Sequence, residues 1–443
     1  MGTALSATDF GQIKSRINSL KAQKAELGRH IAKARRLDPE STGSLIEQMK
    51  AVSDELKALQ KTLKKRLKAV GEESDRTTRW SPELGTIPNA IGDQHVSQFK
   101  ISDYFSDPSR KSAINKYVAE HPAGSIWHTV ETVEFIAKTY GHPSRYLIAT
   151  DATDGVVGIL PLVQLNSRLF GNVIVSTPYF NYGGVLAANR SIADALLEEA
   201  AAWRQQVGAD SIELRHVPDS KLGLKQRTDK LTFWLPLPSD SKDLWDSFQP
   251  KVRAQIRRGE KEKAEILFGR HELLNDFYAV FSRNMRDLGT PVYGKSFFGN
   301  LLDALGSQAT LVVAHIDSFP VGCAFITGFG NRMEIPWAST LREYNHTGIN
   351  MLMYWKVLEL SIAKNCNLFD FGRCSKDAGT YRFKQQWGAT PVQLNWDYVL
   401  NDGEELPGLN PQNPKFRFLI AVWKRMPVWM SRVIGPRVVK FLP

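Results

Sequence analysis

The sequence predicts an α/β (α+β) protein with two similar mixed-sheet halves in tandem, preceded by a helical hairpin. Three observations predict this fold class. A chain of 443 residues is too long for one typical domain. Beyond residue 97, one order of elements (helix, strand hairpin, strand, helix, strand) occurs twice. Before it, two segments carry apolar residues at alternating spacings of three and four, as in the seam of a coiled coil.

The N-terminal part, residues 1–75, predicts an antiparallel coiled-coil hairpin. One apolar seam runs through residues 13–36 and a second through residues 45–70, with a turn signal at residues 38–43. The seam positions are Ile13, Ile17, Leu20, Leu27, Ile31 and Ala34, then Leu45, Met49, Val52, Leu56, Leu59 and Leu63. Polar residues 76–97 predict a linker.

Two domains of one fold are expected next, over residues 98–238 and 239–400. In the first, we expect helices over 129–140 and 192–206, and strands over 145–149, 156–165, 173–176, 183–186 and 211–215. In the second, we expect helices over 273–288 and 349–364, and strands over 310–316, 321–327, 333–338 and 368–371. The proposed split rests on the proline-rich break at residues 236–240. This order predicts mixed sheets covered by helices.

The net charge of +11 is concentrated near the two ends of the sequence. Residues 9–70 hold 15 Lys/Arg and 7 Asp/Glu, and residues 414–443 hold 7 Lys/Arg and no acidic residue, so the body is slightly acidic. Such patches suit a polyanion, either nucleic acid or an anionic membrane surface. The alternative for the hairpin is a solvated helix face.

The predicted C-terminal tail, residues 401–443, mixes apolar and basic side chains. Tryptophans such as Trp423 and Trp429 alternate with lysines and arginines, a composition that suits a membrane interface. The alternative is a helix packed on the body. Pro427 and Pro436 break the tail into short pieces in either case.

Several enzyme classes are disfavoured by absent motifs. The sequence has no Gly-x-x-x-x-Gly-Lys loop, no Gly-x-Ser-x-Gly elbow and no His-Glu-x-x-His pair. Its three cysteines form no Cys-x-x-Cys pair, so we expect neither a metal site nor a disulfide framework. No signal peptide or spanning segment is evident, which predicts a cytoplasmic protein, with peripheral attachment at the inner face of the membrane if the tail binds lipid.

Residues 178–184 form the first candidate binding segment. Tyr179 and Tyr182 supply donors and stacking surfaces, Asn181 adds an amide, and Gly183 lets the backbone approach a ligand closely. The alternative is a strand with a bulge.

Residues 369–388 form the second candidate segment, a strand that runs into a Ser/Gly-rich loop. Ligands commonly bind at such strand ends in α/β folds. Arg373, Arg382 and Lys384 offer cations for an anionic group or for the charge that develops at a reacting carbonyl. The alternative is a set of surface charges around a buried Trp387.

Three segments resemble the Fem-type (FemABX) transferases. The Phe-Lys-x-x-Trp-Gly at residues 383–388, the Asp-Phe-Gly-Arg at residues 370–373 and the basic stretch at residues 251–261 match that family's motifs in order and spacing. The resemblance covers about residues 98–398 and implies two tandem acetyltransferase-like (GNAT, BioF2-like) domains. Members move an aminoacyl group from a charged tRNA onto an amine of a peptidoglycan precursor. The sequence looks most similar to the Fem-like proteins found with exosortase (PEP-CTERM) systems, which accompany exopolysaccharide gene clusters.

The resemblance also implies roles for individual residues. Phe383 and Lys384 would lie at the reaction centre, where a cation in a partly dry cleft stabilises charge on the acyl carbonyl. No general base is evident. Asp370 and Tyr381 are candidates by position, and a structural role is the better reading of Asp370.

Residues 342–350 lead into a predicted helix whose N-terminus suits an anion. Arg342, Asn345 and Gly348 occupy the place where, by resemblance, simple acetyltransferases bind the pyrophosphate of coenzyme A. The usual glycine spacing of that loop is missing, and the alternative is an ordinary capped loop.

Three functions stay open from the sequence. The first is transfer of an aminoacyl or acyl group to an envelope glycan or its lipid-linked precursor, with tRNA held by the basic hairpin. The second is an acetyl-coenzyme A-dependent acetyltransferase acting on a sugar or small amine. The third is a non-catalytic scaffold whose hairpin binds RNA or a partner helix and whose tail binds membrane. We expect no permanently bound cofactor, an acyl donor that is either aminoacyl-tRNA or acyl-coenzyme A, and an oligomeric state left open.

Overall fold

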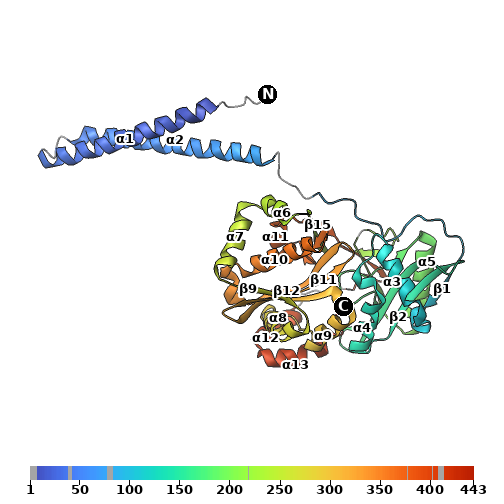
Figure 1. The fold of residues 1–443 in the computed structure, drawn as a ribbon. Coiled ribbons are helices and arrows are strands. Elements are labelled where there is room, and N and C mark those ends of the chain that lie inside the picture. Colours follow the sequence, from blue (N-terminus) through green and yellow to red (C-terminus); the bar gives the residue numbers. More distant parts are fainter. Residues whose placement is uncertain are drawn as a thin grey trace. The chain divides into compact units, whose positions relative to one another are not determined.

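The N-terminal unit is a pair of helices, α1 (Ala7–Leu37) and α2 (Gly43–Arg76), which confirms the predicted helical hairpin (Figure 1). Its buried seam contains Ile17, Leu20, Leu27, Val52 and Leu56. An ion pair of 2.9 Å between Arg16 and Glu55 joins the two helices at their surface. The predicted turn lies outside the described residues at positions 38–41.

The computed structural model describes residues 7–37, 42–76, 83–217, 219–376, 378–401, 403–407 and 414–443. Only the backbone is described for residues 7–14, 33–37, 63–76 and 414–419. Part of the predicted linker (77–82) and part of the predicted tail (402 and 408–413) lie outside these ranges. The chain forms two units, Met1–Arg79 and Trp80–Pro443.

The first sheet of the second unit has eight described strands in the order β1-β2-β3-β4-β6-β16-β7, with β5 paired to β3. The strands are β1 (Phe99–Asp103), β2 (Ser144–Asp151), β3 (Val156–Ser167), β4 (Gly171–Val175), β5 (Leu186–Ala187), β6 (Ser211–His216), β7 (Lys225–Arg227) and β16 (Asn395–Val399). Helices α3 (Lys111–Glu120) and α4 (Val130–Tyr140) share one core with this sheet, and α5 (Arg190–Gln206) shares another on the opposite face.

The second sheet also has eight described strands, in the order β14-β8-β13-β12-β11-β10-β9, with β15 paired to β8. They are β8 (Lys230–Pro236), β9 (Glu265–Gly269), β10 (Ala309–Ile316), β11 (Phe319–Phe329), β12 (Arg332–Thr340), β13 (Leu368–Asp370), β14 (Cys374–Ser375) and β15 (Thr390–Gln393). The helices are α6 (Ser241–Ser247), α7 (Pro250–Lys261), α8 (Leu274–Leu288), α9 (Lys295–Leu305), α10 (Ile349–Ala363) and α11 (Gly379–Gln385). Short 3-10 turns are η2 (Tyr104–Ser106), η3 (Pro108–Arg110), η4 (Ile126–His128), η5 (His271–Leu273), η6 (Gly306–Gln308) and η7 (Arg342–Thr347).

The two sheets repeat one plan. Each has an antiparallel hairpin, a third strand, a crossover helix and a strand parallel to the third: β4 with β6 in the first sheet, and β12 with β13 in the second. The predicted repeat of elements is therefore confirmed. Of the predicted strand at residues 183–186, only its last residue is in a strand, β5.

Each half contributes a strand to the other half's sheet. β8 lies before residue 238 in the chain but pairs with β13 of the second sheet. β16 lies at the end of the second half but pairs with β6 of the first sheet. The predicted boundary at residues 238/239 therefore does not separate the two sheets. The proline-rich break marks the end of β8 instead. The exchange covers the exposed edges of β6 and β13, whose backbone groups would otherwise be unpaired.

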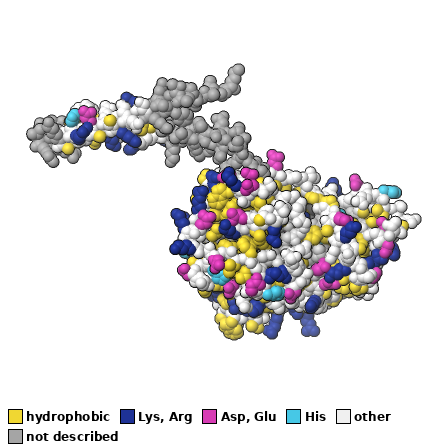
Figure 2. Space-filling model, viewed as in Figure 1, with side chains coloured by type: hydrophobic (Ala, Val, Ile, Leu, Met, Phe, Trp, Pro, Cys, Tyr) yellow, Lys and Arg dark blue, Asp and Glu magenta, His cyan; other side chains and the backbone are white. Residues whose placement is uncertain are grey.

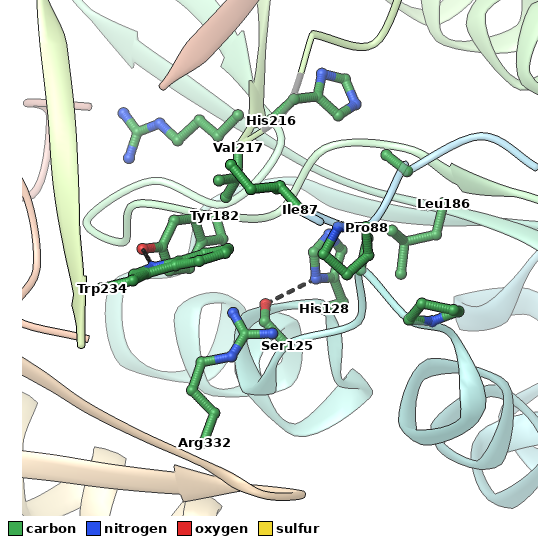
Figure 3. A pocket seen from close by; sticks show the side chains of 14 residues that line it. Ile87, Pro88, Ser125, His128, Tyr182, Leu186, His216, Val217, Trp234 and Arg332 are labelled. Carbon is green, nitrogen blue, oxygen red and sulfur yellow. Dashed lines mark hydrogen bonds between the residues drawn. The ribbon is translucent and has the colours of Figure 1, made fainter. Parts of the chain in front are cut away.

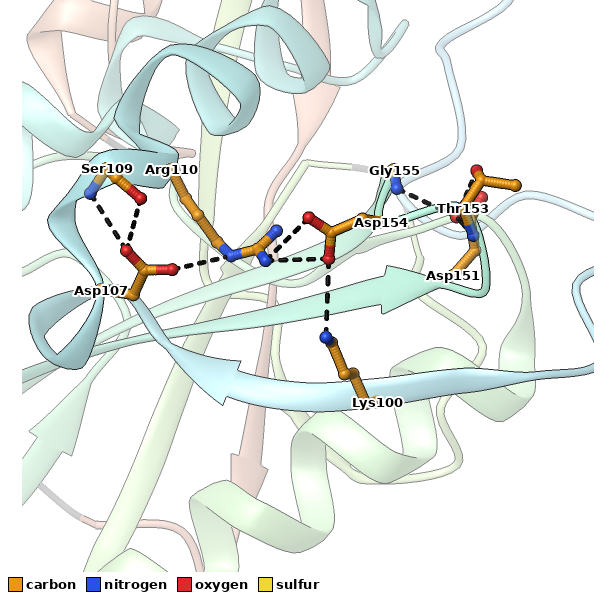
Figure 4. A network of polar contacts seen from close by, with 8 residues as sticks. All are labelled: Lys100, Asp107, Ser109, Arg110, Asp151, Thr153, Asp154 and Gly155. Atoms are coloured by element: carbon orange, nitrogen blue, oxygen red, sulfur yellow. Dashed lines mark hydrogen bonds and ion pairs between the residues drawn. The ribbon is translucent and has the colours of Figure 1, made fainter.

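A polar network fastens one end of the first sheet (Figure 4). Asp154, in the turn between β2 and β3, accepts a 2.8 Å hydrogen bond from Arg110 of η3 and lies 3.5 Å from Lys100 of β1. Asp107 pairs with the same Arg110 at 3.1 Å. Strand β1 and turn η3 are thereby held to the β2–β3 hairpin.

The described tail consists of α12 (Pro414–Arg425) and α13 (Val428–Val439), both packed against α8. Within the described parts of the chain, no helix is long and apolar enough to cross a membrane.

Candidate functional site

The candidate site begins where the parallel strands β12 and β13 separate. Residues Arg332–Glu334 of β12 pair with residues Leu368–Asp370 of β13. Beyond this point β12 continues along β11, whereas the segment that follows β13 turns away at Gly372. Gly372 has a positive φ of 73°, and a Cβ there would lie 3.2 Å from the Ile335 carbonyl oxygen. The positive φ and this close approach both favour glycine, and the turn separates the two strands at the position where α/β folds commonly hold a ligand.

Asp370 is fully buried at this point and organises the surrounding structure. Its carboxylate accepts hydrogen bonds from Thr232 Oγ1 (2.6 Å), Trp234 Nε1 (3.0 Å), the Gly372 amide (2.8 Å) and the hydroxyl of Tyr182. A carboxylate has about four acceptor sites, and four donors fill them here. This geometry makes Asp370 a structural anchor between the two halves and leaves little capacity for it to act as a base.

Lys384 is buried on α11, 6% exposed, beside the same turn. Its Nζ donates to the carbonyl oxygens of Gly372 (2.5 Å) and Arg373 (3.1 Å). Burial lowers its pKa to about 8, although Cys374 and Asp370 favour the charged form. An ammonium has three N–H donors, so one has no partner in the described part of the chain.

Glu334 lies at the end of the paired segment of β12 and was missed from the sequence. It is 5% exposed, and its Oε2 accepts a 2.6 Å hydrogen bond from Trp127 Nε1 of the first half. Burial, and then the charge of Asp370, raise its pKa to about 8. Sequence reasoning misses it because a glutamate between Met333 and Ile335 in a strand matches the alternating pattern of a half-exposed strand, in which the polar residue faces solvent.

The other site residues predicted within the segment 369–388 lie around Asp370 and Lys384. The half-buried ring of Phe383 packs edge-on against Tyr354, with ring centroids 4.9 Å apart. The half-buried ring of Tyr381 packs in the same way against Phe233, with centroids 5.0 Å apart. Arg373 and Arg382 are exposed. The Arg373 guanidinium lies 5.0 Å from the ring centroid of Trp396.

The segment 178–184 is split between two environments. Tyr182 bonds to Asp370, and Asn181 lies beside Gly372, so both belong to the site. Tyr179 instead donates a 2.6 Å hydrogen bond to the Lys440 carbonyl oxygen. Its ring packs against Tyr140, with centroids 5.3 Å apart, so this predicted binding residue is a structural contact to the tail.

The turn before α10, where the sequence predicts an anion site, packs against α7 at Gly348. A Cβ on Gly348 would lie 2.6 Å from the carbonyl oxygen of Gln255, because α7 packs directly against this turn. Arg258 of α7 donates to the His346 carbonyl oxygen at 3.3 Å. Arg342 and Asn345 are exposed on η7. The prediction that these three residues hold an anion gains no support from this packing.

Tyr182 and Trp234 also line a small pocket (Figure 3). Ile87 and Pro88, from the predicted linker, close it opposite Arg332. Its cavity of about 20 Å³ has room for roughly one water molecule, which is too little for an acyl group. The segment that closes it is fixed to β5 by a 2.8 Å hydrogen bond from the Gly92 amide to the Ala187 carbonyl oxygen.

Gly183 is expected to be essential for the stability of this region. Its φ is 143°, and a Cβ would lie 1.7 Å from Thr177 Oγ1. We expect Gly183→Ala to destabilise the protein by about 2–4 kcal/mol, measured by chemical denaturation. Gly85→Ala is the matched control, because a Cβ there meets nothing within 4 Å. Equal unfolding midpoints for both variants would contradict this account.

Comparisons with known proteins agree with this architecture. The family model described as "Acetyltransferase (GNAT) domain" matches residues 247–385, the part that holds Glu334, Asp370 and Lys384. No curated protein matches the chain. The solved structure of FemX aligns with a TM-score of 0.54 at 16% identity, over 66% of this chain and 96% of that one.

Two further solved structures are similar at lower scores. A tandem GNAT protein from the clavulanic acid biosynthesis pathway aligns with a TM-score of 0.47 at 12% identity, over 70% of this chain and all of that one. A conserved protein of unknown function from Bacteroides thetaiotaomicron aligns with a TM-score of 0.49 at 8% identity, over 68% and 100%. The domain match, the FemX alignment and the repeated sheets confirm two tandem GNAT-like domains, the second of which contains the segment that matches the GNAT domain model.

Proposed function

We propose that this chain is an acyltransferase that moves an aminoacyl or acyl group onto an amine or hydroxyl of a cell-envelope glycan or its lipid-linked precursor. The observation that carries the proposal is the buried Lys384 ammonium, which lies where β12 and β13 separate within a GNAT-type domain. A cation held there in a nearly dry position is suited to a carbonyl that gains negative charge.

Lys384 has the role of stabilising the oxyanion. Two of its N–H groups are held by backbone carbonyl oxygens, which fix the side chain before substrate arrives. The third N–H is available to the acyl oxygen. Because the ammonium is already oriented and desolvated, little reorganisation is needed when the charge develops.

Glu334 has the role of general base in this proposal. The acceptor nitrogen or oxygen attacks the acyl carbon and forms the new bond, and Glu334 takes the proton that it loses. The bond from the acyl carbon to the donor's ester oxygen or thioester sulfur then breaks, and the proton returns to that leaving group. A carboxylate with a pKa raised to about 8 is a stronger base than an ordinary glutamate.

Aminoacyl-tRNA is the donor that we favour. The hairpin carries 15 Lys/Arg against 7 Asp/Glu over residues 9–70, a charge that suits a nucleic-acid backbone. The close packing of α7 on Gly348 leaves less room at the position where simple acetyltransferases bind pyrophosphate. The resemblance to Fem-like proteins of exosortase systems suggests exopolysaccharide production as the setting.

Acetyl-coenzyme A is the second candidate donor. It is favoured by the match to an acetyltransferase domain model over residues 247–385. The acceptor would then be a sugar or a small amine.

A donor screen separates these proposals. We expect aminoacyl-tRNA to raise the melting temperature of the full chain and, with a glycan acceptor present, to give an aminoacylated product by mass spectrometry. Changing the exposed Lys21, Lys50 and Lys61 to Gln should weaken the shift, because nucleic-acid binding depends on such charges. Replacing the exposed Lys116, Lys138 and Lys364 outside the hairpin provides the matched control.

Two other outcomes would change the assignment. Stabilisation by acetyl-coenzyme A alone would move the protein to the second candidate. Binding of RNA without turnover of any donor would favour the scaffold that the sequence left open.

A further inference from the structure

The tail helices α12 and α13 present two different faces. One face packs on the body: Ser431, Gly435 and Val439 of α13 are buried. Arg286 of α8 donates a 2.8 Å hydrogen bond to the Met426 carbonyl oxygen, and Arg432 Nε donates to Ser282 Oγ at 2.9 Å. The tail is therefore a fixed part of the second unit.

The opposite face exposes large apolar side chains. In the described part of the chain, four of the nine exposed large apolar residues lie on or beside the tail: Leu288 (58% exposed), Val422 (44%), Trp429 (67%) and Val433 (49%). Trp429 and Val433 are four residues apart on α13 and share one helix face. Leu288 adjoins Gly289, which abuts Ile420 and Lys424 of α12. We call these four residues the tail face.

Exposed basic side chains lie on the same two helices as most of the tail face. Lys424, Arg425 and Arg437 are exposed, and residues 414–443 contain no acidic residue. Asp287, the acidic residue next to Leu288, is already paired with Arg286 at 2.7 Å. Figure 2 shows apolar side chains flanked by Lys and Arg at the lower edge of the body, where Figure 1 places α12 and α13.

We infer that the tail face docks on an anionic membrane surface. An exposed tryptophan with aliphatic neighbours inserts at the headgroup level, and the surrounding lysines and arginines pair with acidic lipids. A second copy of the chain that docked through its own tail face would bring the same positive charge against this one and be repelled. An anionic lipid surface matches both the apolar and the basic side chains at once.

Docking would also orient the candidate site. The carbonyl oxygen of Lys440, at the end of α13, accepts hydrogen bonds from Tyr179 (2.6 Å) and His142 (2.8 Å). Tyr179 is three residues from Tyr182, which bonds to Asp370. The tail is thus joined to the site through residues 179–182. That docking orients the site toward a lipid-linked acceptor rests on the proposed function.

Vesicle co-sedimentation of the full chain tests the inference. We expect binding to vesicles of phosphatidylglycerol and phosphatidylcholine, weakened by salt, and little binding to phosphatidylcholine alone. The triple variant K424Q/R425Q/R437Q should bind on the order of 100-fold more weakly, since each cation near an anionic surface contributes about a factor of five. The double variant W429S/V433S should lose most of the binding to the mixed vesicles.

The controls use the same chemistry elsewhere on the surface. Phe319→Ser removes a 51% exposed apolar side chain, and K251Q/K261Q removes two exposed cations; neither should change vesicle binding. All substituted side chains are exposed, so melting temperatures should be unchanged. Equal binding of W429S/V433S and the unchanged protein would overturn the inference. So would a dimer in light scattering that W429S/V433S abolishes. Because the assay needs no acyl donor, its failure is distinguishable from failure of the donor screen.

Discussion

Replacing Lys384 with methionine is expected to lower acyl transfer by about 10²- to 10³-fold, the usual loss when one charge-stabilising donor is removed. The side chain is 6% exposed, and methionine has a similar length and no charge to desolvate. The Gly372 and Arg373 carbonyl oxygens lose a donor, but the apolar packing is kept. We therefore expect kcat/KM to fall while the melting temperature stays nearly unchanged.

The control for this variant is Lys376→Met, which changes an exposed lysine near the same loop. It should leave both kcat/KM and the melting temperature unaltered. Full activity in Lys384→Met would exclude the proposed role of this lysine. A large drop in melting temperature would instead show that Lys384 is mainly a structural donor to the turn at Gly372.

Much of the fold followed from local patterns in the sequence. The seam of leucines and isoleucines predicted α1 and α2, and apolar runs predicted the strands and crossover helices of both halves. The exchange of β8 and β16 could not be predicted this way, because it depends on which distant strand edges meet. Residues 250–261 and 379–385 stand out in the sequence by their charge and motif, which do not predict that these segments form the helices α7 and α11.

The candidate site was predicted in part, for a physical reason. Lys384, Asp370, Tyr182 and Asn181 come together because both polar segments follow strands that end at the same junction. Tyr179 has a positive φ of 77°, which turns its side chain toward the tail, and no sequence pattern reports that angle. The packing of α7 against Gly348 is a tertiary contact of the same kind.

Glu334 should set one limb of the pH dependence of the reaction. The proposed chemistry needs Glu334 ionised and Lys384 protonated. Burial raises the pKa of Glu334 to about 8, so kcat/KM should rise with pH toward that value. Burial lowers the pKa of Lys384 to about 8, so the rate should fall above it. The profile of kcat/KM is therefore expected to be a narrow bell with its maximum near pH 8.

Replacing Glu334 with glutamine should remove the rising limb of that bell and lower the maximum rate by about 10²-fold or more, the usual contribution of a general base.

The same variant should also change the pH dependence of stability, and the sign of that change follows from the pKa. Because the folded-state pKa is raised from 4.5, the carboxyl's contribution to stability is present below pH 4.5 and is lost as pH rises through about 8. Glutamine has no such loss, so the variant should gain stability relative to the unchanged protein between these pH values. Glu343→Gln, at an exposed glutamate, is the control for both measurements. A rising limb that persists in Glu334→Gln would assign the proton acceptor to another group or to the acceptor substrate itself.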